Sequence, residues 1–319
     1  MAIERENVSP GDVPLQELNL FSIAKLESIL GLKRDELESL ASLAGSFYDP
    51  FVKTDRKRPF QKKFKPPKER KIDNPLDRLK DVQRRIGRSL LKPLDLPFYL
   101  CGGVKGRSVL DCVALHLGAK VIVTLDIRSF FPSVSNLQVY QVWSKLLNCS
   151  PRIAALLTTL TTFERHLPQG APTSTFLANL VLYSVDAPIR RECELKRVVY
   201  TSWVDDLAFS GDCARDIINT AVSALNCASF AVAHKKLKIM GPGDRKVLCG
   251  VLAGRFPSVL PERIARLRSG IHKLRTNQVP EHELPKYLRS LEGSIKQLSI
   301  INPKKGKRLL LEMEAVRNQ

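Results

Sequence analysis

The segment YTSWVDDLAFSG, residues 200–211, places two adjacent carboxylates between two runs of strand-forming residues. Side chains from Tyr200 to Val204 and from Leu207 to Phe209 favour extended backbone, so the segment predicts a β-hairpin with Asp205 and Asp206 in its tight turn. Two like charges in one turn repel each other. The turn is therefore either a solvated bend or a cation site, because carboxylate clusters favour hard divalent ions.

The composition is that of a globular protein, but its charge is strongly basic. Of 319 residues, 44% are hydrophobic and 26% are charged. The net charge of +19 and the pI near 9.8 favour a polyanionic partner, either nucleic acid or an acidic membrane surface. The N-terminus has no signal-peptide core and no apolar run reaches membrane-spanning length, so we expect a cytoplasmic protein that does not span a membrane.

The seven cysteines are odd in number, widely scattered and without a C-x-x-C pair. This pattern predicts free thiols, and neither a zinc site nor a disulfide framework. His116, a single histidine followed by Leu117-Gly118, is interpreted as a structural residue rather than a catalyst.

Apolar residues recur at helical spacing at both ends of the chain. Residues 1–45 are expected to form a helical extension, with apolar positions from Leu15 to Leu40. Residues 256–319 are expected to form a small basic helical domain, interrupted at Pro280, Pro285 and Pro303.

Residues 53–71 carry ten Lys or Arg against two acids, a balance of 10 − 2 = +8. This run is either a flexible solvated loop or a basic hairpin over phosphates. Apolar residues at helical spacing from Leu76 to Leu90 then predict an amphipathic helix with a basic outer surface.

The middle of the chain predicts a strand followed by two helices. Residues 120–126 alternate as a buried strand should, and Asp126 ends it. Ser135 is suited to cap the next helix, and a second helix is expected to start near Thr173 or Ser174.

These acidic residues suit one type of chemistry. Extending a nucleic acid at its 3′-hydroxyl needs charge neutralisation of the attacking and leaving oxygens, which two Mg²⁺ ions about 3.5–4 Å apart can supply. Such ions are held by a few carboxylates on rigid elements. Asp126, Asp205 and Asp206 provide that set if their strands are neighbours.

Three segments together resemble the palm motifs of reverse transcriptases: LDIRSFFPS at 125–133, LPQGAPTSTFLANL at 167–180 and YTSWVDDLAFSG. RKIDNPLDRLKDVQRRI at 70–86 and GGVKGRSVLD at 102–111 further resemble segments of bacterial retron reverse transcriptases. A series of motifs in order is far more specific than any one of them.

The resemblance implies catalytic, metal-binding roles for Asp126, Asp205 and Asp206, with two Mg²⁺ ions and the main-chain carbonyl of Ile127 as a further ligand. Phe131 resembles the family's steric gate against ribonucleotides. From the sequence alone, Phe131 is equally well explained as a core residue beside Phe130.

Other segments resemble the family's nucleotide and nucleic-acid contacts. Gln169 and Gly170 resemble residues against the incoming nucleotide and template, and Arg70, with Lys63 or Lys65, resembles the grip on the triphosphate. Lys236 or its neighbour Lys235 resembles a proton donor to pyrophosphate, although either lysine taken alone is better explained as part of a solvated basic turn. Trp203 replaces the aromatic residue near the primer end. The nucleic-acid contacts expected in the C-terminal domain are Arg266, Lys273, Lys304, Lys305, Lys307 and Arg308.

Some elements depart from the retron pattern. Cys112-Val113-Ala114-Leu115-His116 keeps only the histidine of one element, and Leu248-Cys249-Gly250 alters another. Both elements are associated in the family with recognition of the retron RNA. Their alteration bears on the RNA partner more than on polymerisation.

The resemblance implies an α+β right-hand polymerase fold. The expected regions are fingers with part of the palm at 46–120, a palm with an interleaved fingers segment at 121–255, its antiparallel sheet flanked by helices, and a helical thumb at 256–319. The implied activity is RNA-directed DNA polymerisation by a retron enzyme. A structured non-coding RNA of msr-msd type would be copied with dNTPs, starting from a 2′-OH of that RNA, into branched msDNA. The implied role is phage defence together with a separate effector protein. The alternatives are another bacterial reverse transcriptase, of group II intron or diversity-generating type, and a catalytically idle RNA-binding scaffold.

Overall fold

The computed structural model describes residues 15–54 and 69–317, which divide into two compact units. The first unit contains residues 15–54, 69–112 and 119–242. The second contains residues 113–118 and 243–317. Lys63 and Lys65 of the sequence prediction lie outside the described residues.

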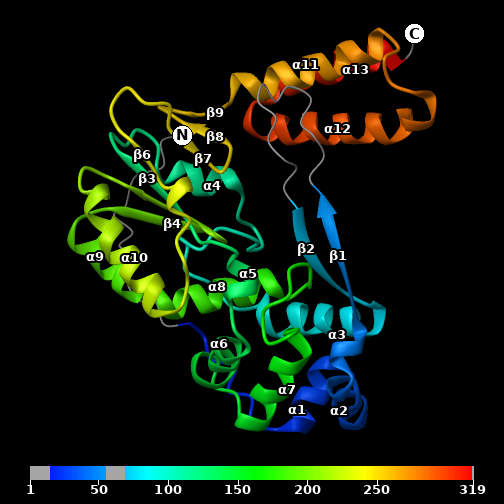
Figure 1. The fold of residues 1–319 in the computed structure, drawn as a ribbon, viewed down its shortest axis with the longest axis vertical. Helices are drawn as coiled ribbons and strands as arrows, with labels where there is room; N and C mark the ends of the chain where they lie inside the picture. The colour runs from blue at the N-terminus through cyan, green and yellow to red at the C-terminus, as the bar shows by residue number, and fades with distance from the viewer. Residues whose placement is uncertain (1–14, 55–68, 318–319) are drawn as a thin grey trace. The chain divides into compact units, whose positions relative to one another are not determined.

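The first unit contains a four-stranded antiparallel sheet (Figure 1). Its strands are β4 (Val199–Trp203), β5 (Asp206–Ser210), β3 (Ile122–Asp126) and β6 (Lys238–Met240), in that spatial order. The inner strands β5 and β3 are almost entirely buried, and Tyr200 on β4 stacks on its cross-strand partner Phe209 with ring centroids 5.2 Å apart. The predicted strand and hairpin are both confirmed.

Helices surround this sheet and close its core. Ser135 accepts a hydrogen bond from the Gln138 amide and caps α6, and α8 begins at Ser174, so both predicted helix starts are confirmed. Buried Asp186, between α8 and α9, accepts hydrogen bonds from the hydroxyls of Tyr99 and Tyr200 and thereby ties the helices to β4. The helices that follow β3 are α5 (Phe130–Ser133), α6 (Asn136–Gln141), η3 (Val142–Leu146), α7 (Pro151–Thr161), α8 (Ser174–Val185), α9 (Ala187–Leu195), η4 (Ala214–Asp216), α10 (Ile217–Cys227) and η5 (His234–Lys236).

The N-terminal extension is only partly helical. The helices α1 (Ile23–Leu30) and α2 (Arg34–Ser42) match the predicted spacing, but residues 15–22 are not helical. Instead, the amides of Leu18 and Asn19 donate to the carbonyl of Leu147. Apolar spacing alone could not reveal this pairing with a distant loop.

A two-stranded ribbon projects from the first unit beside helix α3 (Figure 1). A short turn, η1 (Ala44–Phe47), leads into β1 (Tyr48–Thr54), which pairs with β2 (Glu69–Pro75) in antiparallel register. The amphipathic helix predicted over 76–90 is confirmed as α3 (Asp77–Ile86), which continues as a π-helical turn η2 (Gly87–Leu91).

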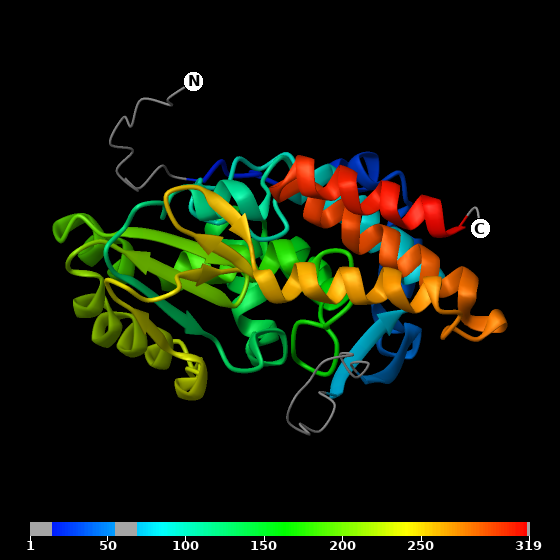
Figure 2. The same ribbon diagram turned by 90° about the horizontal axis from the view of Figure 1, so that it is seen from above.

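The second unit is a three-helix bundle with a small sheet. The strands β7 (Val247–Leu248), β8 (Val251–Ala253) and β9 (Pro257–Val259) lead into α11 (Pro261–Arg275), η6 (Glu281–Glu283), α12 (Leu284–Ile301) and α13 (Pro303–Arg317). The three long helices lie side by side (Figure 2) around buried Ile271, Ile295 and Leu309. Pro285 and Pro303 lie in the first turns of α12 and α13, where a helix needs no amide donor, so the predicted interruptions fall between helices.

Together these elements form an α+β architecture, as predicted. The cysteines among the described residues form no disulfide, and Cys101, Cys112, Cys149 and Cys193 are buried. His116 is completely buried. No helix in the described part of the chain is long and apolar enough to cross a membrane.

Close contact between α12 and α13 depends on Gly306. A methyl group at this position would lie 2.0 Å from Ser299 Oγ and 2.7 Å from its Cα, whereas at Gly293, also helical, it would meet nothing within 4 Å. We expect Gly306→Ala to destabilise the bundle by about 1–3 kcal/mol through overpacking. Gly293→Ala should stabilise it by about 0.5–1 kcal/mol through helix propensity.

Chemical denaturation of the two variants and the parent measures both effects. Equal stabilities of the two alanine variants would contradict the close packing of these helices.

Candidate active site

The turn between β4 and β5 differs from the predicted one by one residue. Trp203 pairs with Asp206, so the turn consists of Val204 and Asp205, and Asp206 is the first residue of β5. Val204 has φ +61°, and Asp205 does not have a positive φ. A positive φ at the first turn residue alone is typical of a type II′ turn, where glycine is preferred. A β-branched residue there is strained by about 1–3 kcal/mol.

The backbone around Gly102 supports this strained turn. A methyl group at Gly102 would lie 2.6 Å from both the amide nitrogen and Cγ2 of Val204. The amide of Cys101 donates to the carbonyl of Ser202 at 2.8 Å, and Asn179 Nδ2 donates to the Gly102 carbonyl at 2.8 Å. Only glycine therefore allows this segment to approach the turn.

The sheet register brings the predicted aspartates together. Asp126 lies directly opposite Asp206 on the neighbouring strand, and the amide of Ile127 donates to the carbonyl of Asp205 at 2.9 Å. Directly opposite residues of an antiparallel pair project from the same face, with Cβ atoms about 4.5–5.5 Å apart. Trp203, opposite Asp206 on its other side, projects from this face as well.

The electrostatics at this position are unfavourable without a cation. Partial desolvation, together with the negative charges of Asp205 and Asp126, raises the pKa of Asp206 to about 6. Asp126 is buried, and its Oδ1 atom has no hydrogen-bond partner among the described residues. A buried, unpartnered carboxylate oxygen beside two other carboxylates fits a ligand for a hard divalent cation.

Lys236 contributes a positive charge to the same place. The amide of Ala233 donates to the carbonyl of Asp126, which brings η5 against the end of β3. Lys236 Nζ lies 2.5 Å from Asp126 Oδ2. Among the described residues, no group of three or more His, Cys, Asp or Glu is arranged so that it could hold a metal ion. The ammonium group of Lys236 instead neutralises part of the charge of Asp126.

The two adjacent phenylalanines have different surroundings. Phe130 is buried and makes an edge contact with Phe230 at 5.3 Å, whereas Phe131, on the first turn of α5, is only partly buried. Phe130 is therefore a core residue, and Phe131 packs against the same core from its edge. Phe131 has an exposed portion five residues after Asp126, where a gate is expected.

The predicted nucleotide contacts Arg70, Gln169 and Gly170 are brought together by β2. Arg70 and Ile72 are two residues apart on this strand, so their side chains lie on the same face. A methyl group at Gly170, which has φ +133°, would lie 3.0 Å from Ile72 Cγ2 and 3.4 Å from the Asp73 carbonyl. The loop that carries Gln169 therefore packs against β2, two residues from Arg70.

The basic residues predicted to contact nucleic acid lie on the second unit. Arg266 and Lys273 are partly buried on α11, and the other four lie exposed near the start of α13. Arg308 pairs with Glu312 at 2.9 Å. Lys304 and Lys305 lie in the first turn of α13, where their positive charges are repelled by the positive end of the helix dipole. The same position favours a bound anion.

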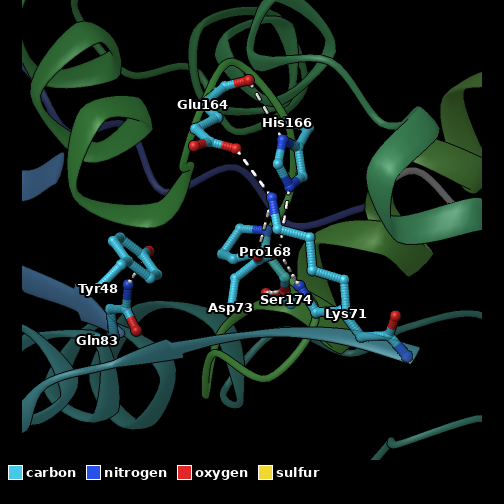
Figure 3. A network of polar contacts seen from close by, with 9 residues as sticks. Tyr48, Lys71, Asp73, Gln83, Glu164, His166, Pro168 and Ser174 are labelled. Carbon is cyan, nitrogen blue, oxygen red and sulfur yellow. Dashed lines mark hydrogen bonds and ion pairs between the residues drawn. The ribbon is translucent and has the colours of Figure 1, made fainter. Parts of the chain in front are cut away.

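Sequence reasoning missed Asp73, His166 and Gly102. Asp73 and His166 form a polar network beside Gln169 (Figure 3). Their signal in the sequence was weak, since one acid in a basic segment and one histidine in a loop are common. Gly102 lay in a motif, but its contact with Val204 required the fold.

Comparison with known proteins supports a specific family. A family model described as "Reverse transcriptase (RNA-dependent DNA polymerase)" matches residues 60–252. The chain is 29% identical over 192 residues to the Retron Se72 reverse transcriptase of Salmonella heidelberg, covering 60% of this chain and 48% of that protein. It is 30% identical over 261 residues to the Retron Mx65 reverse transcriptase of Myxococcus xanthus, covering 75% and 60%.

The Retron Ec86 reverse transcriptase of Escherichia coli is 29% identical over 209 residues, covering 64% of this chain and 65% of that protein. The chain thus spans between about half and two thirds of the length of these curated relatives. The resemblance inferred from the motifs is confirmed.

The raised pKa of Asp206 predicts a pH-dependent stability. Because its pKa in the folded protein is raised, ionisation of Asp206 costs stability as pH rises from about 4 to about 6. Without metal, Asp206→Asn should raise the free energy of unfolding at pH 8 by roughly 1 kcal/mol, a value reduced for solvent screening. This gain should disappear near pH 4.

Thermal unfolding in EDTA and in MgCl₂ measures this difference, and added Mg²⁺ should stabilise the parent more than the variant. Asp95→Asn, which removes an exposed carboxylate from the loop after η2, is the control. A gain for Asp206→Asn that is independent of pH would contradict the charge repulsion.

Proposed function

The chain belongs to the reverse transcriptase family, and from this premise we propose that it is an RNA-directed DNA polymerase of the retron type. The observation that carries the proposal is the pairing of β3 with β5, which sets Asp126 opposite Asp206 next to the turn containing Asp205. Carboxylates at strand ends and a hairpin turn are the arrangement that two-metal phosphoryl transfer requires.

The proposed site has a role for each residue. Asp126, Asp205, Asp206 and the Ile127 carbonyl would hold two Mg²⁺ ions, which when bound would neutralise charge on the attacking 3′-oxygen and the leaving pyrophosphate. Lys236, at Asp126, is positioned to give a proton to pyrophosphate. Arg70 grips the triphosphate, Gln169 and Gly170 lie against the nucleotide, and Phe131 excludes the ribonucleotide 2′-hydroxyl.

The proposed substrate is a structured non-coding RNA of msr-msd type, copied with dNTPs from a primer 2′-hydroxyl into branched msDNA. The similarity to proteins named as retron reverse transcriptases supports this substrate class, as does the net charge of +19. In such a system the chain would act with a separate effector protein in phage defence. The fingers, palm and thumb boundaries given by the sequence are part of the same proposal.

A basic pocket in the first unit suits the path of the template strand. This cavity of about 670 Å³ is lined by residues of α1, α3 and η2 and by Pro172, two residues after Gly170. Arg85 is held in its wall by hydrogen bonds from Nη1 to the carbonyls of Leu30 and Gly31. Arg88 and Lys92 line it without an ion pair to any described residue. We infer that RNA beyond the copied nucleotide passes here.

The test of the activity is dNTP incorporation on a primed RNA template with Mg²⁺. We expect Asp205→Asn to reduce incorporation by at least about a thousandfold, since it removes a ligand charge from the transition state. RNA affinity should remain within about twofold of the parent.

Asp212→Asn, which removes an exposed carboxylate just after β5, is the matched control and should retain activity. A parent that binds RNA but incorporates no dNTP would refute the polymerase and support the RNA-binding scaffold instead.

The pocket predicts a second, separate effect on binding. The double variant Arg88→Ala/Lys92→Ala should weaken binding of a primer–template with a single-stranded 5′ template extension. The slope of log affinity against log salt should fall by about 1.4, or about 0.7 for each lost phosphate contact. A blunt duplex should bind both proteins equally.

Arg191→Ala/Lys145→Ala removes two exposed charges outside the pocket and serves as the control. If both double variants change the slope by the same amount on both substrates, the pocket has no specific part in template binding.

A further inference from the structure

Asp73, near the end of β2, is a buried carboxylate with an unusual set of partners. Its exposed fraction is 1%, so the charge needs compensation inside the protein. The Gln169 amide donates to Asp73 Oδ2 at 3.3 Å, and the Asp73 amide donates to the Gln169 carbonyl at 3.0 Å. Asp73 therefore holds Gln169 through both its side chain and its backbone.

His166 is the second partner of this carboxylate. Its Nε2 lies 3.2 Å from Asp73 Oδ2, and its Nδ1 lies 3.2 Å from the Glu164 carbonyl (Figure 3). An ionised carboxylate only accepts, so Nε2 donates to Asp73 Oδ2. A hydrogen bond to an ionised carboxylate is charge-assisted and therefore stronger than a neutral hydrogen bond.

Lys71 and Glu164 complete the charges around the pair. Lys71 Nζ lies 3.1 Å from Glu164 Oε2 and 3.9 Å from Asp73 Oδ1. Both Lys71 and Glu164 are more than half exposed, so solvent weakens their contribution. Asp73 Oδ1 has no hydrogen-bond partner among the described residues. The side-chain contacts between Asp73 and the loop that carries Gln169 are therefore those of its Oδ2 atom.

The turn that presents His166 is strained. Phe163 and His166 exchange two backbone hydrogen bonds of 2.9 Å, which leaves a two-residue turn at Glu164 and Arg165. Both residues have positive φ, +46° and +63°, as a type I′ turn requires, although such turns favour asparagine and glycine. Non-glycine residues in this region cost about 1–2 kcal/mol each. Retained strain of this kind is typical of functional positions.

The same turn is fixed to the first strand of the ribbon. Phe163 stacks on Tyr48 with ring centroids 4.2 Å apart. Gln83 Nε2 donates to the Tyr48 hydroxyl and to the Leu160 carbonyl, at 2.9 Å each. Segment 163–170 is therefore anchored to β1 at one end and to β2, through Asp73, at the other.

We propose that Asp73 and His166 are positioning residues that set the distance between Arg70 on β2 and Gln169 on the loop. The inference rests on the proposed function, in which these two residues contact the triphosphate and the nucleotide. We call Asp73, His166 and their contacts with Gln169 the clamp. Without the clamp, the loop remains attached to the core through buried residues such as Leu167 but loses its alignment with β2. The defect should appear in dNTP binding.

Steady-state primer extension tests the clamp. Asp73→Ala should raise the KM for dNTP about tenfold, because a loss of roughly 1.4 kcal/mol corresponds to one charge-assisted hydrogen bond. The kcat should change less than about threefold, and RNA affinity should be unchanged. Asp73→Asn keeps an oxygen that can accept from the Gln169 amide and should recover most of the KM.

Glu164→Gln is the matched control, since it weakens the exposed pair with Lys71 but leaves the Glu164 carbonyl on His166. Its KM should equal that of the parent. A fall in thermal stability of Asp73→Ala with an unchanged KM would show a purely structural role and overturn the proposal.

Amide hydrogen exchange of segment 167–172 gives a readout that needs no activity. Asp73→Ala should accelerate exchange at Gln169 about tenfold or more relative to both parent and Glu164→Gln. If the parent incorporates no dNTP, the proposed function fails, and accelerated exchange would still support the clamp. Unchanged exchange would overturn the clamp itself.

Discussion

The antiparallel pairing of β3 with β5 is the constraint on which the rest of the site depends. Register is specified by burial, since a slip of one residue would turn Leu125 and Leu207 out of the core. The same register fixes Asp126 opposite Asp206. The hydrophobic core thus forces two carboxylates together, although a neutral pair would be more stable. This cost, together with the unpartnered Asp126 Oδ1, supports the proposed cation site.

The positions of Asp126 and Asp206 depend on steric features of the surrounding backbone more than on favourable charge interactions. Gly102 leaves room for the strained turn at Val204, and Gly170 lets the loop that carries Gln169 touch β2. At both glycines the backbone lies closer to the neighbouring segment than a residue with a Cβ atom would allow. The positive φ of Val204 places Asp205 in the turn and Asp206 in the strand. The strain at this residue is therefore linked to the separation of the two carboxylates.

Much of the fold was predictable from local patterns, and much of the site was not. Alternation predicted β3, and Ser135 predicted the start of α6, because strand faces and helix caps are properties of a few consecutive residues. The helix predicted over residues 15–22 was wrong, because their hydrogen-bond partner Leu147 is distant in sequence. The choice between Lys235 and Lys236 stayed open for the same reason. The pairing of Ala233 with Asp126 brings Lys236 to the carboxylate, which supports Lys236 as the proposed donor.

The residues proposed to contact the nucleotide illustrate how far reasoning from short motifs extends. Motif resemblance identified Arg70 and Gln169 separately, yet neither motif contains the residue that joins them. Asp73 and Gln169 are 96 positions apart, and their mutual hydrogen bonds form only when β2 and segment 163–170 are both folded. A buried carboxylate without such partners would be strongly destabilising. The folded state of the loop and the burial of Asp73 therefore require each other, so the geometry between the two motifs is a cooperative property of the fold.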